Sequence, residues 1–212
     1  MSGEGNEAPW RKQVAGLVLA GGLARRMGGR HKAFVELGGR PLVARVVERL
    51  RPQVAHVAIS ANAETERLRA YAETVLPDPV PGFAGPLAGV LAGLEWLRRA
   101  CPDMPWLLTV AVDTPFFPSD LARRLWGAVA VEGADMAVAA SGGRAHPVNA
   151  LWPVRIADDL RRALVEEDIR RIGSFFDRYR VARVAFESGE CDPFFNINRE
   201  EHLRAAEKRL NG

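Results

Sequence analysis

The chain has 212 residues, of which 48% are hydrophobic and 26% charged, and its formal net charge is +3 at pH 7. These values predict a stable α/β domain and exclude broad disorder. The longest apolar runs are far too short to cross a bilayer, so we expect no membrane association. No RNA-recognition motif with interleaved aromatic residues accompanies the positive charge, and we therefore expect small anionic molecules rather than nucleic acid as partners.

The beginning of the chain and its cysteines bear on organisation and location. Residues 1–12 are expected to form a disordered arm, because their start is acidic and lacks the basic and apolar segments of a secretory signal. Cys101 and Cys191 lie far apart without C-x-x-C spacing, which disfavours both a disulfide framework and a zinc site. We expect reduced thiols, a cytoplasmic location and a single domain over residues 13–212.

Strand and helix patterns alternate along the rest of the chain. We expect strands at residues 14–19, 54–60, 74–76, 106–112, 134–140, 145–152 and 181–186. We expect helices at residues 41–50, 64–72, 86–100, 118–131, 156–166, 172–177 and 199–210. This alternation predicts a three-layer α/β/α fold with a mostly parallel central sheet. The strand at 145–152 is expected to return antiparallel at an edge of that sheet.

A glycine- and arginine-rich loop follows the first strand. The segment LAGGLARRMGGRHK covers residues 19–32. Gly21 and Gly22 allow the backbone to approach a ligand closely and expose N–H groups to anionic oxygens. The positive side chains of the loop include Arg25, Arg26 and Lys32. Such a loop at the carboxyl edge of a parallel sheet predicts phosphoryl or nucleotidyl transfer.

Two common phosphate-binding templates do not fit this loop. Lys32 is followed by Ala33 rather than by Ser or Thr, so the P-loop spacing is absent. No G-x-G-x-x-G dinucleotide fingerprint is present either. An ordinary ATPase or dehydrogenase is therefore disfavoured, and a plain basic surface loop is the remaining alternative to a phosphate site.

Transfer from a triphosphate also needs a divalent cation near the phosphates, and Asp113 is the candidate ligand. This residue directly follows the strand expected to be most buried, at residues 106–112. Mg²⁺ keeps several waters and takes few protein carboxylates, so one aspartate can suffice. The alternative is that Asp113 caps the following helix, since Asp before Thr-Pro is common in turns.

Two further polar side chains are expected at the same edge. Asn62 follows the second strand, and its amide can donate to and accept from a purine. Asp78 stands between two prolines, ahead of the turn at residues 85–89 that opens the next helix with exposed N–H groups. A helix cap at Asn62 and an Asx turn at Asp78 are the structural alternatives.

These motifs resemble those of a known family. The string L-A-G-G followed by R-M-G and a lysine, at residues 19–32, resembles the signature of the nucleotidyltransferase superfamily, and within it the molybdenum cofactor guanylyltransferase (MobA) family. Asp113-Thr114-Pro115-Phe116 is similar to its D-x-P-F/Y motif, and residues 85–89 to its G-P-L-A-G turn. His146-Pro147-Val148 and Phe195-Asn196-Ile197-Asn198 resemble two weaker elements.

The resemblance implies a nucleotidyltransferase (Rossmann-like) fold and a reaction in which GMP passes from GTP to molybdenum-bound molybdopterin, with Mg²⁺ as cofactor. It implies catalytic roles for Arg26, Lys32 and Asp113, and a metal at Asp113. The nucleotide- and substrate-binding positions that it implies are Leu19, Ala20, Gly21, Gly22, Lys32, Asn62, Asp78, Gly85, Asp113, Asn196 and Asn198. Proteins that deliver the pterin or accept the product are possible partners. His146 is left out, because an ionised phosphate nucleophile needs no general base.

Some alternatives stay open. Many members of the family carry Asp before the motif lysine, whereas this chain has Arg30-His31, which puts any role of that aspartate in doubt. Asn198, with Glu201 three residues later, also fits a capping box. A related cytidylyl- or sugar-phosphate nucleotidyltransferase and a non-catalytic GTP-binding accessory protein are the other functional interpretations. Gly22 favours guanine, because cytidylyl relatives tend to have alanine there.

Overall fold

A computed structural model describes residues 9–21, 23–24, 30–80, 82, 85–189 and 191–211. Within these ranges no helix is both long and apolar enough to cross a membrane. The helices are α1 Leu42–Leu50, α2 Thr65–Leu68, α3 Pro86–Ala100, α4 Leu121–Glu132, α5 Ala157–Val165, α6 Ile172–Phe176 and α7 Glu200–Asn211. Short 3₁₀ helices lie at Pro9–Gln13, Lys32–Phe34, Arg51–Gln53 and Val154–Ile156.

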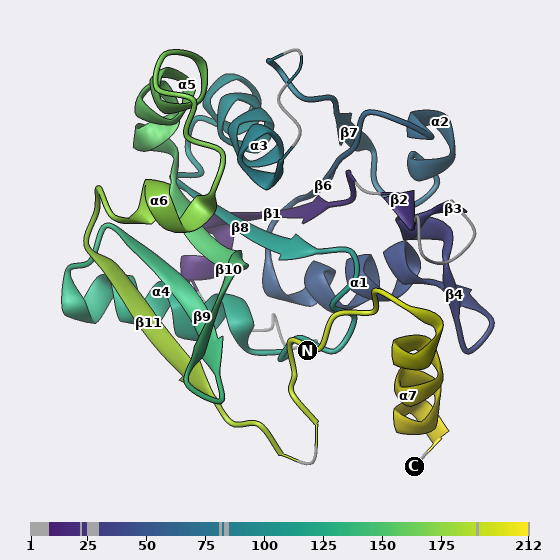
Figure 1. The fold of residues 1–212 in the computed structure, drawn as a ribbon. Helices are drawn as coiled ribbons and strands as arrows, with labels where there is room; N and C mark the ends of the chain where they lie inside the picture. The colour runs from purple at the N-terminus through teal and green to yellow at the C-terminus, as the bar shows by residue number, and fades with distance from the viewer. Residues whose placement is uncertain are drawn as a thin grey trace, which may run out of the picture.

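Seven strands of the described part of the chain form the central sheet (Figure 1). They are β1 Val14–Leu19, β6 Val57–Ser60, β7 Thr74–Leu76, β8 Trp106–Ala111, β9 Met136–Ser141, β10 Arg144–Pro153 and β11 Val181–Phe186. Their order is β11-β9-β10-β8-β1-β6-β7. Every neighbouring pair is parallel except the two that β10 makes, with β8 and with β9. The expected mostly parallel sheet is confirmed.

The chain reverses its direction of travel across the sheet at β1. From β1 it moves outward to β6 and β7, and after α3 it returns to β8 on the other side of β1. Open α/β sheets bind ligands at the carboxyl ends of strands beside such a reversal. The order of the strands therefore points to the ends of β1, β6 and β8.

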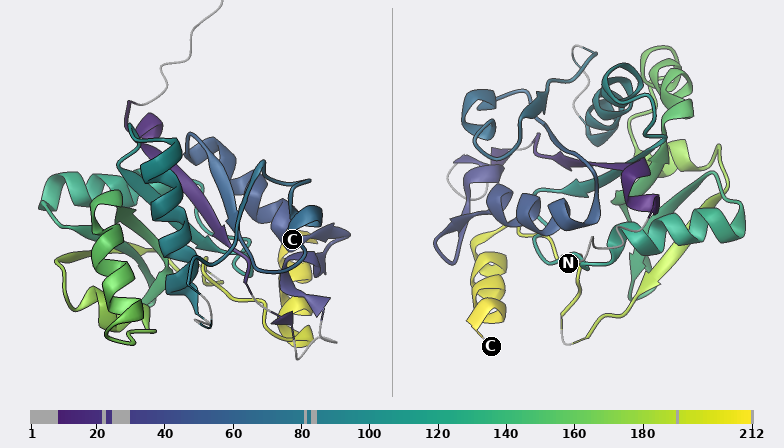
Figure 2. Two further views of the ribbon diagram at one scale, coloured as in Figure 1. Left: turned by 90° about the horizontal axis from the view of Figure 1, so that it is seen from above. Right: turned by 180° about the vertical axis from the view of Figure 1, so that it is seen from behind.

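Two hydrophobic clusters cover the two faces of the sheet. In β1, Val14 and Val18 belong to the cluster with α1 and α4, whereas Ala15 and Leu17 belong to the cluster with α3, α5 and α6. This alternation follows from the two-residue period of a strand. Figures 1 and 2 show the sheet between these helix layers, so the three-layer α/β/α fold is confirmed.

Glycines on α3 allow this helix to lie very close to the sheet. A Cβ atom at Gly89 would come within 2.6 Å of Ser60 Oγ and 2.7 Å of Leu19 Cδ2. At Gly93 it would come within 2.7 Å of side-chain atoms of Leu17 and Leu107. The four-residue spacing puts both glycines on one face of α3. The close packing fixes the beginning of α3 beside the ends of β1 and β6.

Strand β10 differs from the expectation. It is antiparallel, as predicted, but it lies between β8 and β9 rather than at an edge. The edge position is taken by β11, which returns after α5 and α6 to pair parallel with β9. Burial on both sides fits the apolar second half of β10, where Ala150, Leu151 and Trp152 are fully buried.

Other boundaries shift by a few residues. The expected helix at 64–72 is only the single turn α2, and β6 begins at Val57 rather than at residue 54. Of the expected arm at residues 1–12, residues 1–8 lie outside the described ranges. Residues 9–12 belong to the 3₁₀ helix Pro9–Gln13, where the Trp10 ring lies 6.2 Å from that of Trp126 in α4.

Two antiparallel pairs of short strands complete the fold. The pairs are β2 Leu23–Ala24 with β3 Arg30–His31, and β4 Glu36–Leu37 with β5 Arg40–Pro41. In the first pair Leu23 lies opposite His31. Both ends of the loop after β1 are therefore held together, which returns Lys32 to the carboxyl edge of the sheet.

Candidate active site

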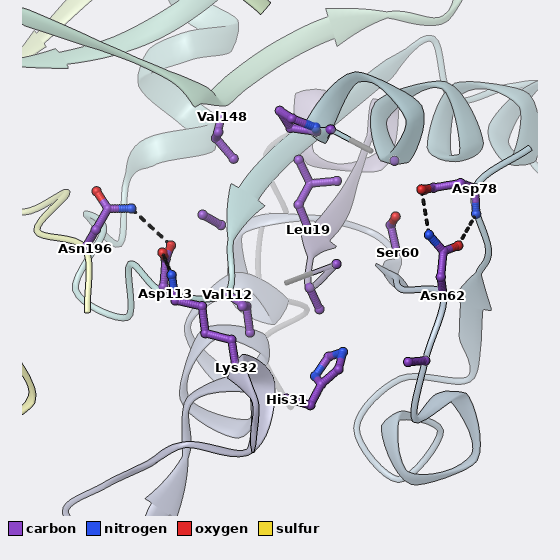
Figure 3. A pocket seen from close by; sticks show the side chains of 17 residues that line it. Leu19, His31, Lys32, Ser60, Asn62, Asp78, Val112, Asp113, Val148 and Asn196 are labelled. Carbon is purple, nitrogen blue, oxygen red and sulfur yellow. Dashed lines mark hydrogen bonds and ion pairs between the residues drawn. The ribbon is translucent and has the colours of Figure 1, made fainter. Parts of the chain in front are cut away.

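A cavity of about 540 Å³ opens at the carboxyl ends of β1, β6 and β8 (Figure 3). Its size suits a small-molecule ligand, for which pockets of about 300–1,000 Å³ are typical. It is lined by Leu19, Ala20, Gly21, His31, Lys32, Ser60, Asn62, Ala63, Asp78, Gly85, Pro86, Gly89, Ala111, Val112, Asp113, Val148 and Asn196. Nine of the positions expected from the sequence are among them. These nine positions come from seven separate stretches of the chain.

Charged and amide side chains meet at one end of this cavity. The Lys32 ammonium group donates hydrogen bonds to Asp113 Oδ2 and to Asn198 Oδ1. Asn196 Nδ2 donates to the other carboxylate oxygen, Asp113 Oδ1, at 3.1 Å. The side chains of Lys32 and Asp113 are 16% and 11% exposed, so solvent screens their attraction only partly. The cluster joins the loop after β1, the end of β8 and the segment before α7.

The structure excludes the capping interpretation of Asp113. Helix α4 begins at Leu121 with Asp120 at its N-cap position, so Asp113 does not cap it. The backbone of Asp113 also takes part, because its carbonyl accepts a 2.9 Å hydrogen bond from the N–H of Ile197. Asn198 directs its side-chain oxygen to Lys32. This oxygen therefore contacts the Lys32–Asp113 cluster rather than forming the capping box that was the alternative, although Asn198 itself is not among the lining residues.

The same cluster offers oxygen atoms to a hard cation. Asp113 brings a carboxylate, and Asn196 and Asn198 bring amide oxygens, which are the donors that Mg²⁺ prefers. Among the residues that the structure describes, no group of three or more His, Cys, Asp or Glu side chains could hold a metal. The donor set thus fits a cation that keeps water and substrate oxygens as its remaining ligands, as Mg²⁺ does.

The other end of the cavity holds a reciprocal pair. Asn62 Nδ2 donates to Asp78 Oδ2 at 2.7 Å, and the Asp78 backbone N–H donates to Asn62 Oδ1 at 2.8 Å. Burial raises the pKa of Asp78 above its ordinary value, and the hydrogen bond from Asn62 opposes that rise. Figure 3 shows the pair on the opposite side of the cavity from Asp113 and Asn196. Each residue fixes the orientation of the other.

Backbone groups form the wall between these two ends. Leu19, Ala20 and Gly21 follow β1, and Ala20 N–H is bonded to Ser60 O at 2.9 Å. Gly85 lies at the start of α3, whose first N–H groups have no partner within the helix. Free N–H groups at a helix start favour anions.

The described residues do not include every position expected from the sequence. Arg26, for which a catalytic role was expected, and its neighbour Arg25 lie outside the described residues, as does Gly22. His146 is not among the lining residues. It instead forms a cluster with Ser141 and Asp192, described next.

The Ser141 hydroxyl donates to Asp192 Oδ1 at 2.7 Å, and its oxygen lies 2.6 Å from His146 Nε2, from which it accepts. The His146 ring also stacks on Phe194, with centroids 4.7 Å apart. Burial lowers the pKa of His146, and the positive charge of Arg144 lowers it further. The negative charge of Asp192 acts in the opposite direction. The cluster ties the β9–β10 hairpin to the segment that leads to Asn196.

Four residues that line the cavity have no role in the site by sequence reasoning: Ser60, Ala63, Val112 and His31. The first three lie at or just after the ends of strands β6 and β8, and this position is the signal that could have identified them as lining residues. In the sequence, His31 stands out only as a departure from the family motif. Its place beside Lys32 was the signal that could have identified it.

Comparisons with known proteins agree with this geometry. Residues 16–183 match the family model described as MobA-like NTP transferase domain. The chain belongs to this family. Members of the MobA-like family named molybdenum cofactor guanylyltransferase include one from Bradyrhizobium sp. (strain ORS 278), 52% identical over 92% of each chain. Another, from Rhodopseudomonas palustris (strain BisB5), is 51% identical over 91% of each chain.

Solved structures are also similar to this member of the MobA-like family. The molybdopterin-guanine dinucleotide biosynthesis protein A of Archaeoglobus fulgidus has a TM-score of 0.74 and 26% identity, covering 93% of this chain and 98% of its own. A 4-diphosphocytidyl-2C-methyl-D-erythritol synthase from Anaerococcus prevotii has a TM-score of 0.72 at 15% identity, covering 95% and 97%. The second likeness concerns the fold alone. Both confirm the nucleotidyltransferase fold expected from the sequence.

Proposed function

We propose that this chain transfers GMP from GTP to molybdenum-bound molybdopterin, forming the molybdopterin guanine dinucleotide cofactor and releasing pyrophosphate. Membership of the MobA-like NTP transferase family makes the chain a nucleotidyltransferase. Relatives about half identical over nine-tenths of both chains carry the name molybdenum cofactor guanylyltransferase. The observation that carries the proposal is the cavity with the Lys32–Asp113 cluster at one end and the Asn62–Asp78 pair at the other.

The charged end suits the triphosphate. Lys32 has a mobile ammonium group that can leave Asp113 and follow the charge that builds up on the departing pyrophosphate. Backbone N–H groups near Gly21 and at the start of α3 add donors that need no rearrangement when negative charge develops. These groups favour in-line attack of the acceptor phosphate on the α-phosphorus mainly by position and electrostatics.

Asp113, Asn196 and Asn198 would hold Mg²⁺, which supplies charge neutralisation on the phosphates when it is bound. Asp113 is held for this task from two sides, by Asn196 Nδ2 on its carboxylate and by Ile197 N–H on its backbone. Lys32 donates hydrogen bonds to the second carboxylate oxygen of Asp113 and to Asn198 Oδ1. Its ammonium group must move toward the phosphates when the cation binds, which places a positive group on each side of the reacting centre.

The amide end suits the nucleoside. Among the described residues only Oδ2 of the Asp78 carboxylate receives a side-chain hydrogen bond, from Asn62. Asp78 Oδ1 is left to accept hydrogen bonds from ribose hydroxyls or from the N–H edge of guanine. Asn62 keeps the carboxylate in that orientation. The acceptor would enter from the side of Val148 and Asn196, which lies opposite this pair in Figure 3. A cytoplasmic location and protein partners that deliver or collect the cofactor belong to the same proposal.

The test is pyrophosphate release from GTP, CTP, ATP and UTP with Mg²⁺, with and without molybdenum-bound molybdopterin. We expect release from GTP that depends on the acceptor and falls on the order of 100-fold or more in Asp113→Asn. Asp103→Asn is the matched control, because Asp103 is exposed and does not line the cavity.

Two outcomes would contradict the proposal. Release that occurs with CTP and not with GTP would make the chain a cytidylyl relative. Binding of GTP without acceptor-dependent release would make it a non-catalytic accessory protein.

A further inference from the structure

His31 lines the cavity but has no part in the chemistry described so far. The residue is buried, with 9% of its surface exposed. Figure 3 shows its ring entering the cavity beside Lys32. The pairing of β3 with β2 places its backbone opposite Leu23. The fold therefore holds this ring at the cavity wall.

Neither ring nitrogen of His31 has a hydrogen-bond partner in the part of the chain that the structure describes. Nδ1 is enclosed by protein atoms, whereas Nε2 is not enclosed and reaches the cavity. The ring packs against Phe34, with centroids 5.7 Å apart. Buried polar groups nearly always have a partner, so an unpaired imidazole in a cavity calls for one. A ligand in the cavity can supply it.

The surroundings of His31 decide its protonation. Burial lowers the pKa of His31 below 6.5, while Glu64 raises it and Arg67 lowers it. The ring is therefore neutral at physiological pH and carries one N–H group. An enclosed N–H without an acceptor is rarer in proteins than an enclosed acceptor without a donor, which favours the proton on Nε2. The cavity thus receives a hydrogen-bond donor that adds no positive charge.

The position of His31 in the cavity determines which part of a bound nucleotide the ring can contact. The next residue, Lys32, belongs to the phosphate end with Asp113. Glu64 and Arg67, which are near enough to influence the charge of the ring, belong to the segment that follows Asn62 at the nucleoside end. His31 lies between the two ends, where the α-phosphate joins the phosphates to the ribose.

We propose that His31 Nε2–H donates a hydrogen bond to an oxygen of the α-phosphate of the bound nucleotide. This rests on the proposed function and adds a neutral contact at the atom where transfer takes place. A neutral donor stabilises the charge that develops on the α-phosphate without holding the product, which keeps this phosphate, as tightly as another cation would.

Calorimetric titration of GTP and of GMP into the full chain with Mg²⁺ and without acceptor tests this contact. In Gln the amide group can reach the place of Nε2, whereas in Asn it lies near Nδ1, and Phe has no polar atom. We expect His31→Phe and His31→Asn to weaken GTP and GMP binding about tenfold, as one hydrogen bond to a charged oxygen suggests. His31→Gln should stay within about threefold of the unchanged chain. Guanosine binding should not change in any variant.

The controls separate a contact from a structural role. His56→Phe replaces an exposed histidine outside the cavity and should not alter binding. Removing the enclosed, unpaired Nδ1 should leave the melting temperature of ligand-free His31→Phe unchanged or raise it by about 2–4 °C.

Three results would overturn the proposal. His31→Phe binding GTP as well as the unchanged chain would show that there is no contact. An equal loss of guanosine affinity would move the contact to the nucleoside, and failure of Gln to restore binding would exclude a donor at Nε2.

This experiment distinguishes the His31 contact from the proposed function. An unchanged chain that binds GTP without transferring GMP would refute the function while the titration still decides on His31. An unchanged chain that binds no GTP would refute both.

Discussion

Lys32 and Asp113 stand 81 positions apart in the sequence and form an ion pair at one end of the cavity. The same ammonium group is bonded to Asn198, 166 positions away. One side chain thus connects the beginning, the middle and the last part of the chain. Because both members of the ion pair are largely buried, loss of either one leaves an uncompensated group.

Lys32→Met should affect both catalysis and folding. We expect GMP transfer to fall on the order of 100- to 1,000-fold, because a charge on the phosphates is lost. The free energy of unfolding should fall by about 1–3 kcal/mol, because Asp113 keeps only its amide partner Asn196. Transfer kinetics and chemical denaturation measure the two effects. Lys208→Met, at an exposed position in α7, should change neither, and normal transfer by Lys32→Met would exclude a role for this side chain.

Two helix glycines should respond to alanine in opposite directions. Gly89→Ala places a methyl group 2.6 Å from Ser60 Oγ, which should cost about 1–3 kcal/mol and raise KM for GTP by displacing the start of α3. Gly127→Ala, in α4, meets nothing within 4 Å and should stabilise the chain by about 0.4–1 kcal/mol. Denaturation curves and KM values of both variants test this contrast. Equal stability of the two variants would show that α3 can move away from the sheet without loss.

Asp78→Asn should change how stability depends on pH. Burial raises the folded-state pKa of Asp78 above 3.8, so this group favours folding most below pH 3.8, and that contribution is lost as the pH rises through the folded pKa. The variant keeps an acceptor for Asn62 but does not ionise. Its stability relative to the unchanged chain should therefore increase with pH across this window, while its affinity for GTP falls. Denaturation at a series of pH values tests the sign, and a constant difference would contradict it.

His146→Gln should show the opposite dependence. Burial lowers the folded-state pKa of His146 below 6.5, so its contribution to stability is present above pH 6.5 and lost as the pH falls through the folded value. Gln can keep the hydrogen bond to Ser141 without titrating. We expect the variant to lose less stability than the unchanged chain on acidification from pH 7 to about 5. His56→Gln, at an exposed position outside the cavity, serves as the control.

Ser141→Ala tests what the neighbouring cluster does for the cavity. The hydroxyl connects His146 with Asp192, and Asp192 Oδ1 also accepts the N–H of Phe194 at 2.8 Å. Its removal should cost about 1 kcal/mol of stability and reduce GMP transfer less than tenfold, because Asn196 is then held less firmly. Comparison of KM for GTP with KM for the acceptor shows which substrate's binding depends on this cluster. A loss as large as that of Asp113→Asn would instead assign chemistry to this cluster.

Much of the sheet could be predicted because its strands are apolar on both faces. The strand at 14–19 and the helix at 86–100 appear with the expected bounds. The position of β10 could not be predicted, because it depends on β11 pairing with β9 across two intervening helices. Local patterns do not specify which strand takes an edge. The short α2 likewise depends on the following turn rather than on helix propensity.

The site was predictable where residues directly follow strands. Leu19 to Gly21, Asn62 and Asp113 reach one edge because parallel strands end there together. The bonds among Lys32, Asp113 and Asn198 could not be derived from local patterns, because they depend on how the segment before α7 crosses the sheet. The roles of these residues in binding and transfer stay predictions.

The backbone bond from Ile197 to Asp113 has a consequence for the order of events during synthesis. A growing chain that has left the ribosome as far as residue 190 already contains every strand of the central sheet, since β11 ends at Phe186. It lacks the segment that holds Asp113 in place and that gives Lys32 its second partner. The sheet can therefore form while translation is still under way, but a competent nucleotide site appears only after residues 196–198 have been made.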